Sequence, residues 1–322
     1  MLNSPRTICV LGGTGFVGRH LCARLARDGH SLRVLTRYRE QHRHLLVLPT
    51  VSTVQGDVHD EAFLERAMDG CDAVINLVGI LNEKGRKGEG FERAHAELTR
   101  KVLRACKETG VRRLLQMSAL KADAENGPSH YLRTKGKAEA AVRLEEGPAL
   151  HSTIFQPSVI FGQEDSFVNR FAGLVRIPNY FFVLPSPNAR FAPVFVDDVV
   201  EAFALSLDDH RTWGKTFQLC GPKVMSLREI IAFIARTMGY KRKVIGLGDG
   251  LSRMLARIME FVPGKPLSLD NYRSLKVHSI CDNNGFAAFG ISPASMEAVV
   301  PHYLAGHYER ARLSELRAQA RG

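Results

Sequence analysis

The chain has 322 residues, 45% of them hydrophobic, and a formal net charge of +11 at pH 7. This length suffices for one large core or two modest ones. No apolar run reaches the ~18–20 residues that a transmembrane helix needs, which argues against a membrane-spanning protein. The positive charge favours acidic partners such as cofactor phosphates, an anionic substrate or an anionic lipid surface.

The basic residues are spread along the chain without a basic patch interleaved with aromatics, so no nucleic-acid partner is expected. The first residues lack the apolar segment of a secretory signal, which predicts a cytoplasmic protein. The six cysteines are isolated and form no Cys-x-x-Cys pair. We expect all six to be reduced core residues, not disulfides or metal ligands, and we expect no metal site.

The first half of the chain alternates short β-branched runs with helical patterns. Its predicted elements are strands at 8–11, 32–36, 51–55, 73–78, 113–117 and 152–156, and helices at 18–28, 62–68, 91–109 and 131–145. This βαβ alternation predicts the α/β class, with a doubly wound parallel (Rossmann) sheet that helices cover on both faces.

After Pro157 the regular alternation ends. The further predicted elements are strands at 194–196 and 215–219, and helices at 167–176, 197–207, 227–238, 251–261 and from about 292. We expect a smaller mixed α/β C-terminal lobe over the strand ends, where a substrate would bind. The expected domains are a dinucleotide-binding domain at 1–160 and 191–221, and a substrate or partner lobe at 161–190 and 222–322.

A glycine-rich loop follows the first predicted strand and leads into a predicted helix. Gly12 permits a tight turn, Gly15 lets backbone N–H groups approach a pyrophosphate, and Gly18 removes a side chain where the helix crosses the strand. The start of the helix offers unpaired N–H donors and a positive partial charge. The strand, loop and helix together predict a dinucleotide site.

Further along the chain, three residues have side chains suited to a site that interconverts a carbonyl and an alcohol. Tyr131 and Lys135 are four residues apart, so they share one face of a predicted helix. A protonated lysine beside the phenol is expected to lower the tyrosine pKa. Tyr131 would then exchange a proton with the substrate oxygen, and Ser118, at the end of the fifth strand, would orient that oxygen.

These motifs resemble those of an extended or atypical member of the short-chain dehydrogenase/reductase superfamily, along essentially the whole chain. The matching pieces are 12–18, Gly56-Asp57, 76–79, Ser118, Tyr131 with Lys135, 156–162 and 194–199. Residues 131–135 and 161–167 are also similar to one branch, which contains the nucleotide-binding accessory subunit of respiratory complex I. Bacterial proteins of this branch are often labelled NADH dehydrogenase-like or nucleotide-sugar epimerase-like.

The resemblance implies a set of cofactor-binding residues. Those at the pyrophosphate would be Gly12, Thr14, Gly15, Phe16, Val17 and Gly18. Those at the adenine and the riboses would be Asp57, Val58, Leu77, Val78, Gly79 and Lys135. Those nearer the nicotinamide would be Met117, Tyr131, Pro157, Val159 and Ile160. Asp57 has a second interpretation, as a carboxylate that caps a turn.

The end of the second strand bears on cofactor choice. An NAD site usually places an acidic residue there for the ribose 2′-hydroxyl, whereas this chain has Arg37 and no acid before Glu40. Arg37 would meet a 2′-phosphate through a charge-assisted contact worth ~1.5–3 kcal/mol. We therefore expect NADP(H) in preference to NAD(H), with a solvated basic loop as the alternative.

The chain also departs from the family pattern. His95 and its neighbours stand where extended relatives carry an asparagine, and we expect His95 to be a packed or hydrogen-bonded helix residue. The stripe of apolar residues in 251–261 is expected to face the core. Its alternative is a surface that rests on a membrane or admits a long apolar substrate such as a quinone precursor.

Three functions remain open from the sequence. The first is an NADP(H)-dependent oxidoreductase of a small-molecule substrate, with Ser118, Tyr131 and Lys135 as its catalytic residues. The second is a non-catalytic, nucleotide-loaded accessory or assembly protein of a respiratory or ubiquinone-biosynthesis complex, peripheral to the inner face of a membrane. The third is a nucleotide-sugar epimerase or dehydratase, against which the missing acid after the second strand argues.

Overall fold

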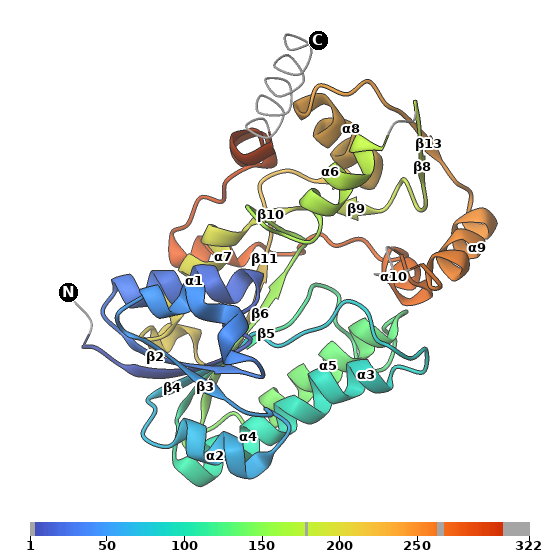
Figure 1. Ribbon diagram of the computed structural model, residues 1–322. Coiled ribbons are helices and arrows are strands. Elements are labelled where there is room, and N and C mark those ends of the chain that lie inside the picture. Colours follow the sequence, from blue (N-terminus) through green and yellow to red (C-terminus); the bar gives the residue numbers. More distant parts are fainter. Residues whose placement is uncertain (1–3, 178–179, 263–266, 305–322) are drawn as a thin grey trace. The chain divides into compact units, whose positions relative to one another are not determined.

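The computed structural model describes residues 4–177, 180–262 and 267–304, and the chain divides into two units (Figure 1). Unit 1 consists of Met1–Pro157, Val196–Leu219 and Cys281–Ile291. Unit 2 consists of Ser158–Phe195, Cys220–Ile280 and Ser292–Gly322.

A seven-stranded sheet forms the centre of unit 1, and all of its strands are parallel. In spatial order they are β11 (Lys215–Leu219), β6 (His151–Pro157), β5 (Arg113–Met117), β4 (Ala73–Asn76), β1 (Thr7–Leu11), β2 (Ser31–Thr36) and β3 (Val51–Gln55). Strand order runs one way from β1 to β3 and the other way from β4 to β11. This confirms the predicted doubly wound fold.

Helices cover both faces of this sheet (Figure 1). On one face α1 (Phe16–Arg27) packs against α7 (Val196–Ser206), and Arg24 of α1 donates to both carboxylate oxygens of Glu201 in α7 at 2.7 and 3.1 Å. On the other face α2 (Glu61–Met68) packs against α4 (Leu98–Thr109), and α4 against α5 (His130–Leu144). The shorter helices of unit 1 are Arg39–Val47, α3 (Glu89–Phe91), Glu92–Glu97, His210–Thr212 and Gly285–Phe289.

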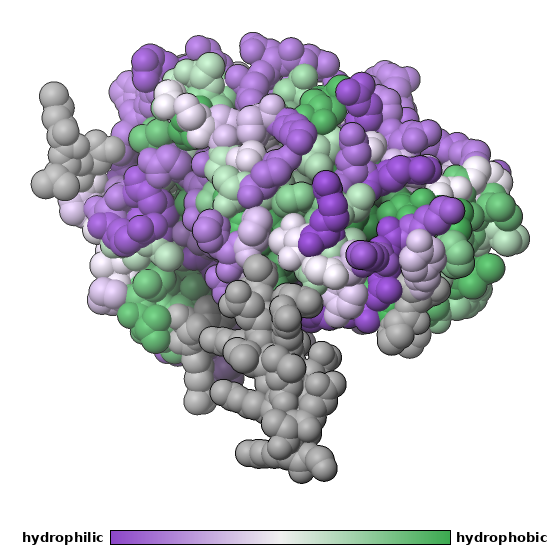
Figure 2. Space-filling model, turned by 90° about the horizontal axis from the view of Figure 1, so that it is seen from above, coloured by the Kyte–Doolittle hydropathy of each residue, from purple (hydrophilic) through white to green (hydrophobic). Residues whose placement is uncertain are grey.

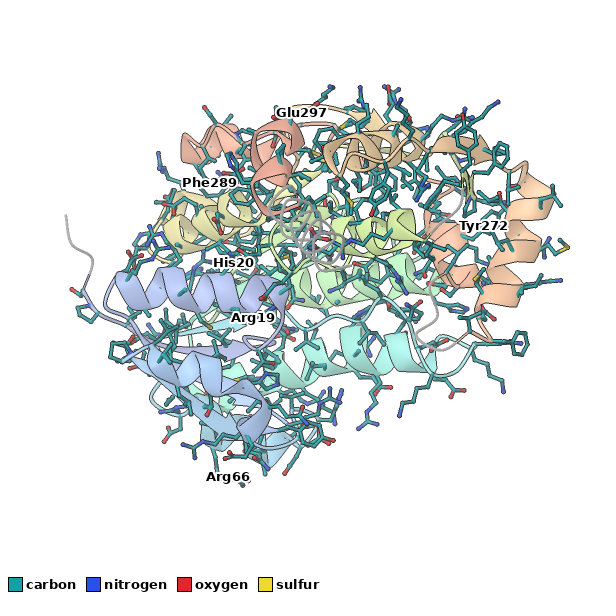
Figure 3. All side chains as sticks on the ribbon, turned by 45° about the horizontal axis from the view of Figure 1, so that its top comes forward. Arg19, His20, Arg66, Tyr272, Phe289 and Glu297 are labelled. Carbon is teal, nitrogen blue, oxygen red and sulfur yellow. The ribbon has the colours of Figure 1, made fainter. Side chains whose placement is uncertain are left out.

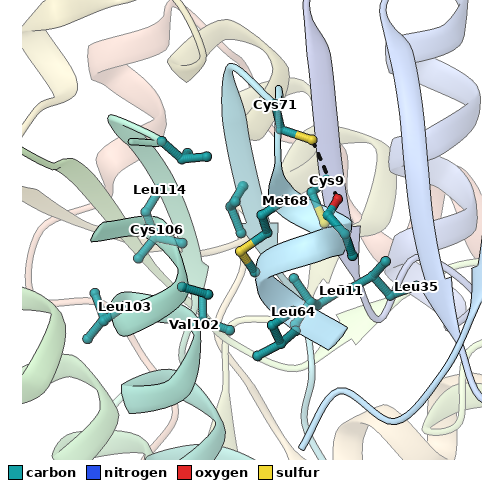
Figure 4. Packing of buried hydrophobic residues seen from close by; sticks show 14 of the residues in the cluster. Cys9, Leu11, Leu35, Leu64, Met68, Cys71, Val102, Leu103, Cys106 and Leu114 are labelled. Carbon is teal, nitrogen blue, oxygen red and sulfur yellow. Dashed lines mark hydrogen bonds between the residues drawn. The ribbon is translucent and has the colours of Figure 1, made fainter. Parts of the chain in front are cut away.

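One core of unit 1 lies between the sheet and α2, α4 and α5 (Figure 4). Cys9 and Leu11 of β1 pack there beside Leu64 of α2 and Val102 of α4. Successive strand residues point to opposite faces, so Ile8, which is also fully buried, points toward α1 and α7. Burial on both faces explains why these strands are continuous apolar runs without alternation.

The cysteines divide into two groups. Those of the first group are buried and free: Cys9, Cys22, Cys71 and Cys106. Burial raises the pKa of the Cys22 and Cys106 thiols to about 12, so both stay protonated. Cys220 and Cys281 are disulfide-bonded, so the prediction of six unpaired cysteines is wrong for these two. Spacing along the chain gives no information on which distant thiols meet.

The described residues of unit 2 form three two-stranded sheets and several helices. Its strand pairs are β7 (Ile160–Phe161) with β10 (Val194–Phe195), β9 (Arg190–Phe191) with β12 (Met225–Ser226), and β8 (Phe181–Leu184) with β13 (Lys243–Gly246). Its helices are α6 (Val168–Arg176), α8 (Leu227–Thr237), α9 (Asp249–Met259), α10 (Leu269–Ser274) and a helical stretch at 296–304. The last begins four residues after the expected start.

The core of unit 2 forms where α6 and α8 pack together, with Val168 and Ile230 fully buried in it. A capping box starts α8: Ser226 accepts from the backbone N–H of Glu229, and the Glu229 carboxylate accepts from the backbone N–H of Ser226. Sequence patterning predicted β10, as a strand at 194–196, and missed the other strands of unit 2, most of which are too short for a periodic signal. Among the described helices, none has the length and hydropathy to span a bilayer.

Candidate functional site

The glycine-rich loop turns sharply at the carboxyl end of β1. Gly12 has a φ of +76°, and a Cβ there would lie 3.1 Å from backbone atoms of Leu77 and Val78. A Cβ on Gly18 would lie 2.3 Å from the carbonyl oxygen of Gly12. A side chain at either position would therefore clash with these backbone atoms and displace the loop. Gly15 is the exposed N-cap of α1, and a Cβ there would lie 3.3 Å from the Gly12 carbonyl oxygen.

The N-terminus of α1 has the properties of an anion site. Gly15 provides no side chain to cap the helix, and the first turn, Phe16 to Arg19, holds no acidic residue. The first backbone N–H groups of a helix have no partner within it, and they carry a positive partial charge. A pyrophosphate fits this loop because the glycines leave room for it and the helix supplies donors.

The loop after β4 lies next to the glycine-rich loop. The backbone N–H of Leu77 donates to the Leu11 carbonyl at 3.0 Å, and the N–H of Val78 donates to the Asn76 side chain at 3.1 Å. Because the strand order reverses between β1 and β4, a crevice is expected at their carboxyl ends. The predicted residues 77–79 are therefore at the switch point of the sheet.

Lys135 connects α5 to the ends of two strands. Its buried Nζ donates to the carbonyl oxygens of Met117 at 3.1 Å and Val78 at 3.3 Å. A Cβ on Gly79 would approach Nζ to 3.2 Å, so the glycine leaves room for this buried ammonium group beside the loop after β4. Burial lowers the pKa of Lys135 to about 8, although the Glu139 carboxylate opposes the shift.

Tyr131 lies one helical turn before Lys135, within a group of rings. Its ring centroid is 5.4 Å from that of His95 and 6.2 Å from that of Phe91, and both pairs meet edge to face. Burial raises the pKa of Tyr131 to about 12. The expectation that Lys135 lowers this pKa is wrong, because desolvation of the phenolate dominates and the lysine ammonium donates to two backbone carbonyls.

Ser118 is held by a buried carboxylate that sequence reasoning missed. The Ser118 hydroxyl donates to Oε1 of Glu139, which also accepts from Gln156 Nε2 at 2.7 Å. The other oxygen of Glu139 accepts from Arg143 at 2.8 Å. The hydroxyl proton of Ser118 is thus committed to Glu139, while its oxygen keeps the capacity to accept a hydrogen bond.

The position of Glu139 has a simple signal in the sequence. Tyr131, Lys135, Glu139 and Arg143 recur at intervals of four residues, which places all four along one side of α5. Such a row of alternating charges is typical of a solvated helix face. The pattern therefore does not by itself indicate that Glu139 is buried. Its first members lie against strand ends, so Lys135 and Glu139 are only 3% and 2% exposed.

His95 is a structural residue of this region, as predicted. It belongs to the π-helical stretch Glu92–Glu97, which interrupts the long helix expected at 91–109. Its Nε2 accepts from the backbone N–H of Ile80 at 3.1 Å, so Nδ1 carries the proton and donates to Thr134 Oγ1 at 2.9 Å. Burial and the nearby Lys135 charge lower the pKa of His95 to about 2.

The other predicted residues of unit 1 end neighbouring strands. Arg37 is exposed directly after β2, and Asp57 follows β3, the next strand in the sheet. The Asp57 carboxylate accepts from the backbone N–H of His59 at 2.9 Å, which is the turn-capping role considered as its alternative. Val58 is partly buried against the core, and Pro157 ends β6.

Val159 and Ile160 belong to unit 2 and are described within it alone. The Val159 carbonyl accepts from the Val194 N–H at 3.0 Å, and Ile160 lies in β7. Unit 1 therefore brings together the glycine-rich loop, residues 77–79 and Lys135 by direct contacts or close approaches. Tyr131, Ser118 and Met117 join them through α5 and the end of β5.

Comparisons with known proteins agree with this architecture. Residues 12–168 match the family described as NAD(P)H-binding. Subunit 9 of the NADH dehydrogenase (ubiquinone) 1 alpha subcomplex, from Arabidopsis thaliana mitochondria, is 29% identical over 92% of this chain and 75% of its own. A ceramide reductase of Caulobacter vibrioides is 32% identical over 75% of this chain and 74% of its own.

Solved structures show the same fold. The UDP-glucose 4-epimerase of Thermotoga maritima has a TM-score of 0.73 at 17% identity, and the match covers 95% of this chain and 99% of that one. A similar match, with a TM-score of 0.71 at 16% identity, is MoeE5 in complex with UDP-glucose and NAD, over 96% of this chain and 99% of that one.

The parallel sheet, the glycine-rich loop and these relatives together define an NAD(P)-binding protein of the α/β class. The chain belongs to the short-chain dehydrogenase/reductase superfamily, in the extended branch that includes the complex I subunit. This confirms the resemblance found in the sequence.

Proposed function

We propose that the protein is an NADP(H)-dependent oxidoreductase that reduces a carbonyl group of a small-molecule substrate. The observation that carries this proposal is the placement of Lys135, whose ammonium group lies at the carbonyls of Val78 and Met117, one helical turn after Tyr131. The dinucleotide would occupy unit 1, and unit 2 would contribute to the binding of the substrate or a partner.

Each residue has a part in holding the dinucleotide. The loop at 12–18 would bind the pyrophosphate and Arg37 the 2′-phosphate. Lys135 would donate to the hydroxyls of the nicotinamide ribose, because its ammonium group already faces backbone acceptors beside Gly79. When bound, the reduced nicotinamide supplies a hydride to the carbonyl carbon.

Tyr131 would supply the proton in this reduction. With a pKa of about 12, its phenol is protonated at neutral pH and is ready to donate to a substrate oxygen that gains negative charge. Ser118 would accept a hydrogen bond from the product hydroxyl, since its own O–H group donates to the Glu139 carboxylate.

Two relatives support a reductase by their names, the ceramide reductase of Caulobacter vibrioides and a quinoline-oxide ketoreductase of Stigmatella aurantiaca, 24% identical over 78% of this chain and 79% of its own. The two solved structures support the fold alone, at 16–17% identity. A nucleotide-sugar epimerase or dehydratase stays the less supported alternative, because Arg37 stands where an acid would hold NAD.

The test is NADPH oxidation with a panel of aliphatic and aromatic ketones. For any ketone that the wild type reduces, Tyr131→Phe should lower turnover by ~10²–10⁴, the usual contribution of a positioned proton donor. NADPH affinity, measured by titration calorimetry, should stay within a few fold of wild type, since the ring contacts remain. Unchanged turnover in Tyr131→Phe would remove the tyrosine from the mechanism.

The cofactor preference depends on Arg37. Arg37→Ala should weaken NADPH binding by roughly ten- to a hundredfold, the worth of a charge-assisted contact, and should leave NADH binding unchanged. Arg66→Ala, at an exposed arginine of α2, is the matched control. Equal affinities of the wild type for NADPH and NADH would mean that Arg37 lies in a solvated loop and does not contact the 2′-phosphate.

A second candidate is a nucleotide-loaded accessory or assembly protein of a respiratory or ubiquinone-biosynthesis complex. It is favoured by the similarity to the complex I subunit, which is 29% identical over 92% of this chain. The bound dinucleotide would then stabilise the fold by mass action. Co-purification with a membrane complex, and a dinucleotide whose redox state never changes, would support this candidate over the reductase.

A further inference from the structure

Helix α9 presents its apolar side to solvent. Leu251, Met254 and Ile258, spaced at three and four residues, are each 54% exposed, whereas the buried positions of the helix are Ser252 and Ala256. A surface helix normally does the reverse. The expectation that this stripe faces the core is therefore wrong, and the hydropathy pattern alone could not reveal it, because periodicity defines a stripe without saying what covers it.

Polar contacts on the inner side hold α9 in this orientation. Ser252 Oγ donates to the Leu247 carbonyl at 3.3 Å and accepts from the Ser186 N–H at 3.3 Å. At the start of the helix, the hydroxyl of Tyr272 in α10, which Figure 3 labels, donates to the Asp249 carboxylate. These contacts come from three separate segments of unit 2, so the outward direction of the large side chains is set by tertiary structure.

Basic side chains border the apolar stripe. Arg253 and Arg257 are exposed, and at 100° per residue they lie between the buried side of α9 and the apolar stripe. The strand that precedes α9, β13, adds Ile245, 40% exposed, and its register partner in β8, Val183, is 50% exposed. Figure 2 shows hydrophobic residues gathered at the right-hand side, where Figure 1 draws α9.

We propose that α9 docks unit 2 onto the surface of an anionic lipid bilayer. Its 11 residues are too few to cross a bilayer, but large apolar side chains beside arginines are the pattern of a helix that lies in the interface. The apolar side chains would enter the acyl boundary while Arg253 and Arg257 meet lipid phosphates. The formal charge of +11 adds a general attraction to the same surface.

Sedimentation with vesicles tests the proposal. The full chain is mixed with vesicles of 70% phosphatidylcholine and 30% phosphatidylglycerol, or of phosphatidylcholine alone, at about 0.1 M salt, where surface charges are felt over ~10 Å. The wild type should bind the anionic vesicles at least tenfold more tightly than the neutral ones. Equal binding to both, or binding to neither, would overturn the proposal.

Two variants locate the surface on α9. Leu251→Ser/Met254→Ser/Ile258→Ser should reduce the partition coefficient at least tenfold. Arg253→Gln/Arg257→Gln should reduce it by roughly 25-fold, since each basic residue near an anionic surface is worth about 1 kcal/mol, or about fivefold. Val47→Ser/Leu144→Ser removes two apolar side chains that are 79% and 83% exposed in unit 1, and should bind as the wild type does.

Two further measurements check the fold of the variants and the oligomeric state of the wild type. Urea unfolding of each variant checks that unit 2 is intact, which is expected because the changed side chains are exposed. Light scattering of the wild type checks for self-association. A dimer that the triple serine variant breaks, with vesicle binding equal in both, would assign the surface to a second copy and overturn the proposal. The reductase activity enters none of these readouts.

Discussion

Three titratable side chains of unit 1 lie within the candidate site, and burial favours the neutral form of each. It lowers the pKa of Lys135 to about 8 and that of His95 to about 2, and it raises that of Tyr131 to about 12. At neutral pH the phenol and the imidazole are uncharged, and Lys135 is the charged member of the three. The protonation of Lys135 should therefore set the basic limit of activity.

The pKa of His95 predicts a loss of stability in acid. The unfolded chain binds a proton at His95 below pH 6.5 and the folded one only below about 2, so this contribution to stability is complete above pH 6.5 and falls as the pH drops. At pH 4 the loss is about 3 kcal/mol. His95→Gln should show a correspondingly smaller difference in unfolding free energy between pH 7 and pH 4.

Urea unfolding at the two pH values measures this difference. His302→Gln, which changes a histidine of unit 2, is the matched control and should follow the wild type. Parallel pH dependence in the wild type and His95→Gln would mean that His95 is protonated in the folded chain, against the hydrogen bond that its Nε2 accepts from Ile80.

At the scale of elements, the turn between β1 and α1 is the most sequence-determined part of the site. Gly12 and Gly18 are required by a positive φ and by a close backbone approach, respectively. By contrast, the π-helical stretch Glu92–Glu97 that positions His95 had no signal. A single widened turn depends on contacts with neighbours such as Thr134, which are distant in sequence.

Gly18→Ala tests the packing of this turn. Its Cβ would lie 2.3 Å from the Gly12 carbonyl oxygen, so the loop must move, and NADPH affinity should fall at least tenfold with ~1–3 kcal/mol of stability lost. Gly173→Ala, in the middle of α6 with open space at the Cβ, should gain ~0.5–1 kcal/mol. Calorimetric titration and urea unfolding measure both; unaltered NADPH binding in Gly18→Ala would contradict the close approach.

At the scale of the molecule, Arg113 connects segments of unit 1 that are far apart in the chain. This guanidinium, only 3% exposed, donates to Thr153 of β6, to the Ser206 carbonyl at the end of α7 and to Thr212, at 2.6–3.0 Å. Burial lowers its pKa to about 10, and it stays charged at neutral pH. These three acceptors lie around Nη2, and Nη1 donates to the His151 carbonyl at 3.2 Å, so the guanidinium spreads its donors over two nitrogens, which a single ammonium group cannot do.

Arg113→Lys should therefore lower the unfolding free energy by about 2 kcal/mol, the loss of at least one charged hydrogen bond. The exposed neighbour Arg112→Lys should have an effect within about 0.5 kcal/mol. Both are measured by urea unfolding. Equal stability of the two variants would show that the buried donors are dispensable.

The sequence by itself determined the alternation of strands and helices, the glycine turn and the family, because these depend on local periodicity and on residues adjacent in the chain. The tertiary structure alone decided that α9 turns its apolar stripe outward, that Ser118 donates to Glu139 and that Cys220 and Cys281 are disulfide-bonded. Each of these depends on which distant segments meet, and therefore on burial and on hydrogen-bond partners that no local pattern contains.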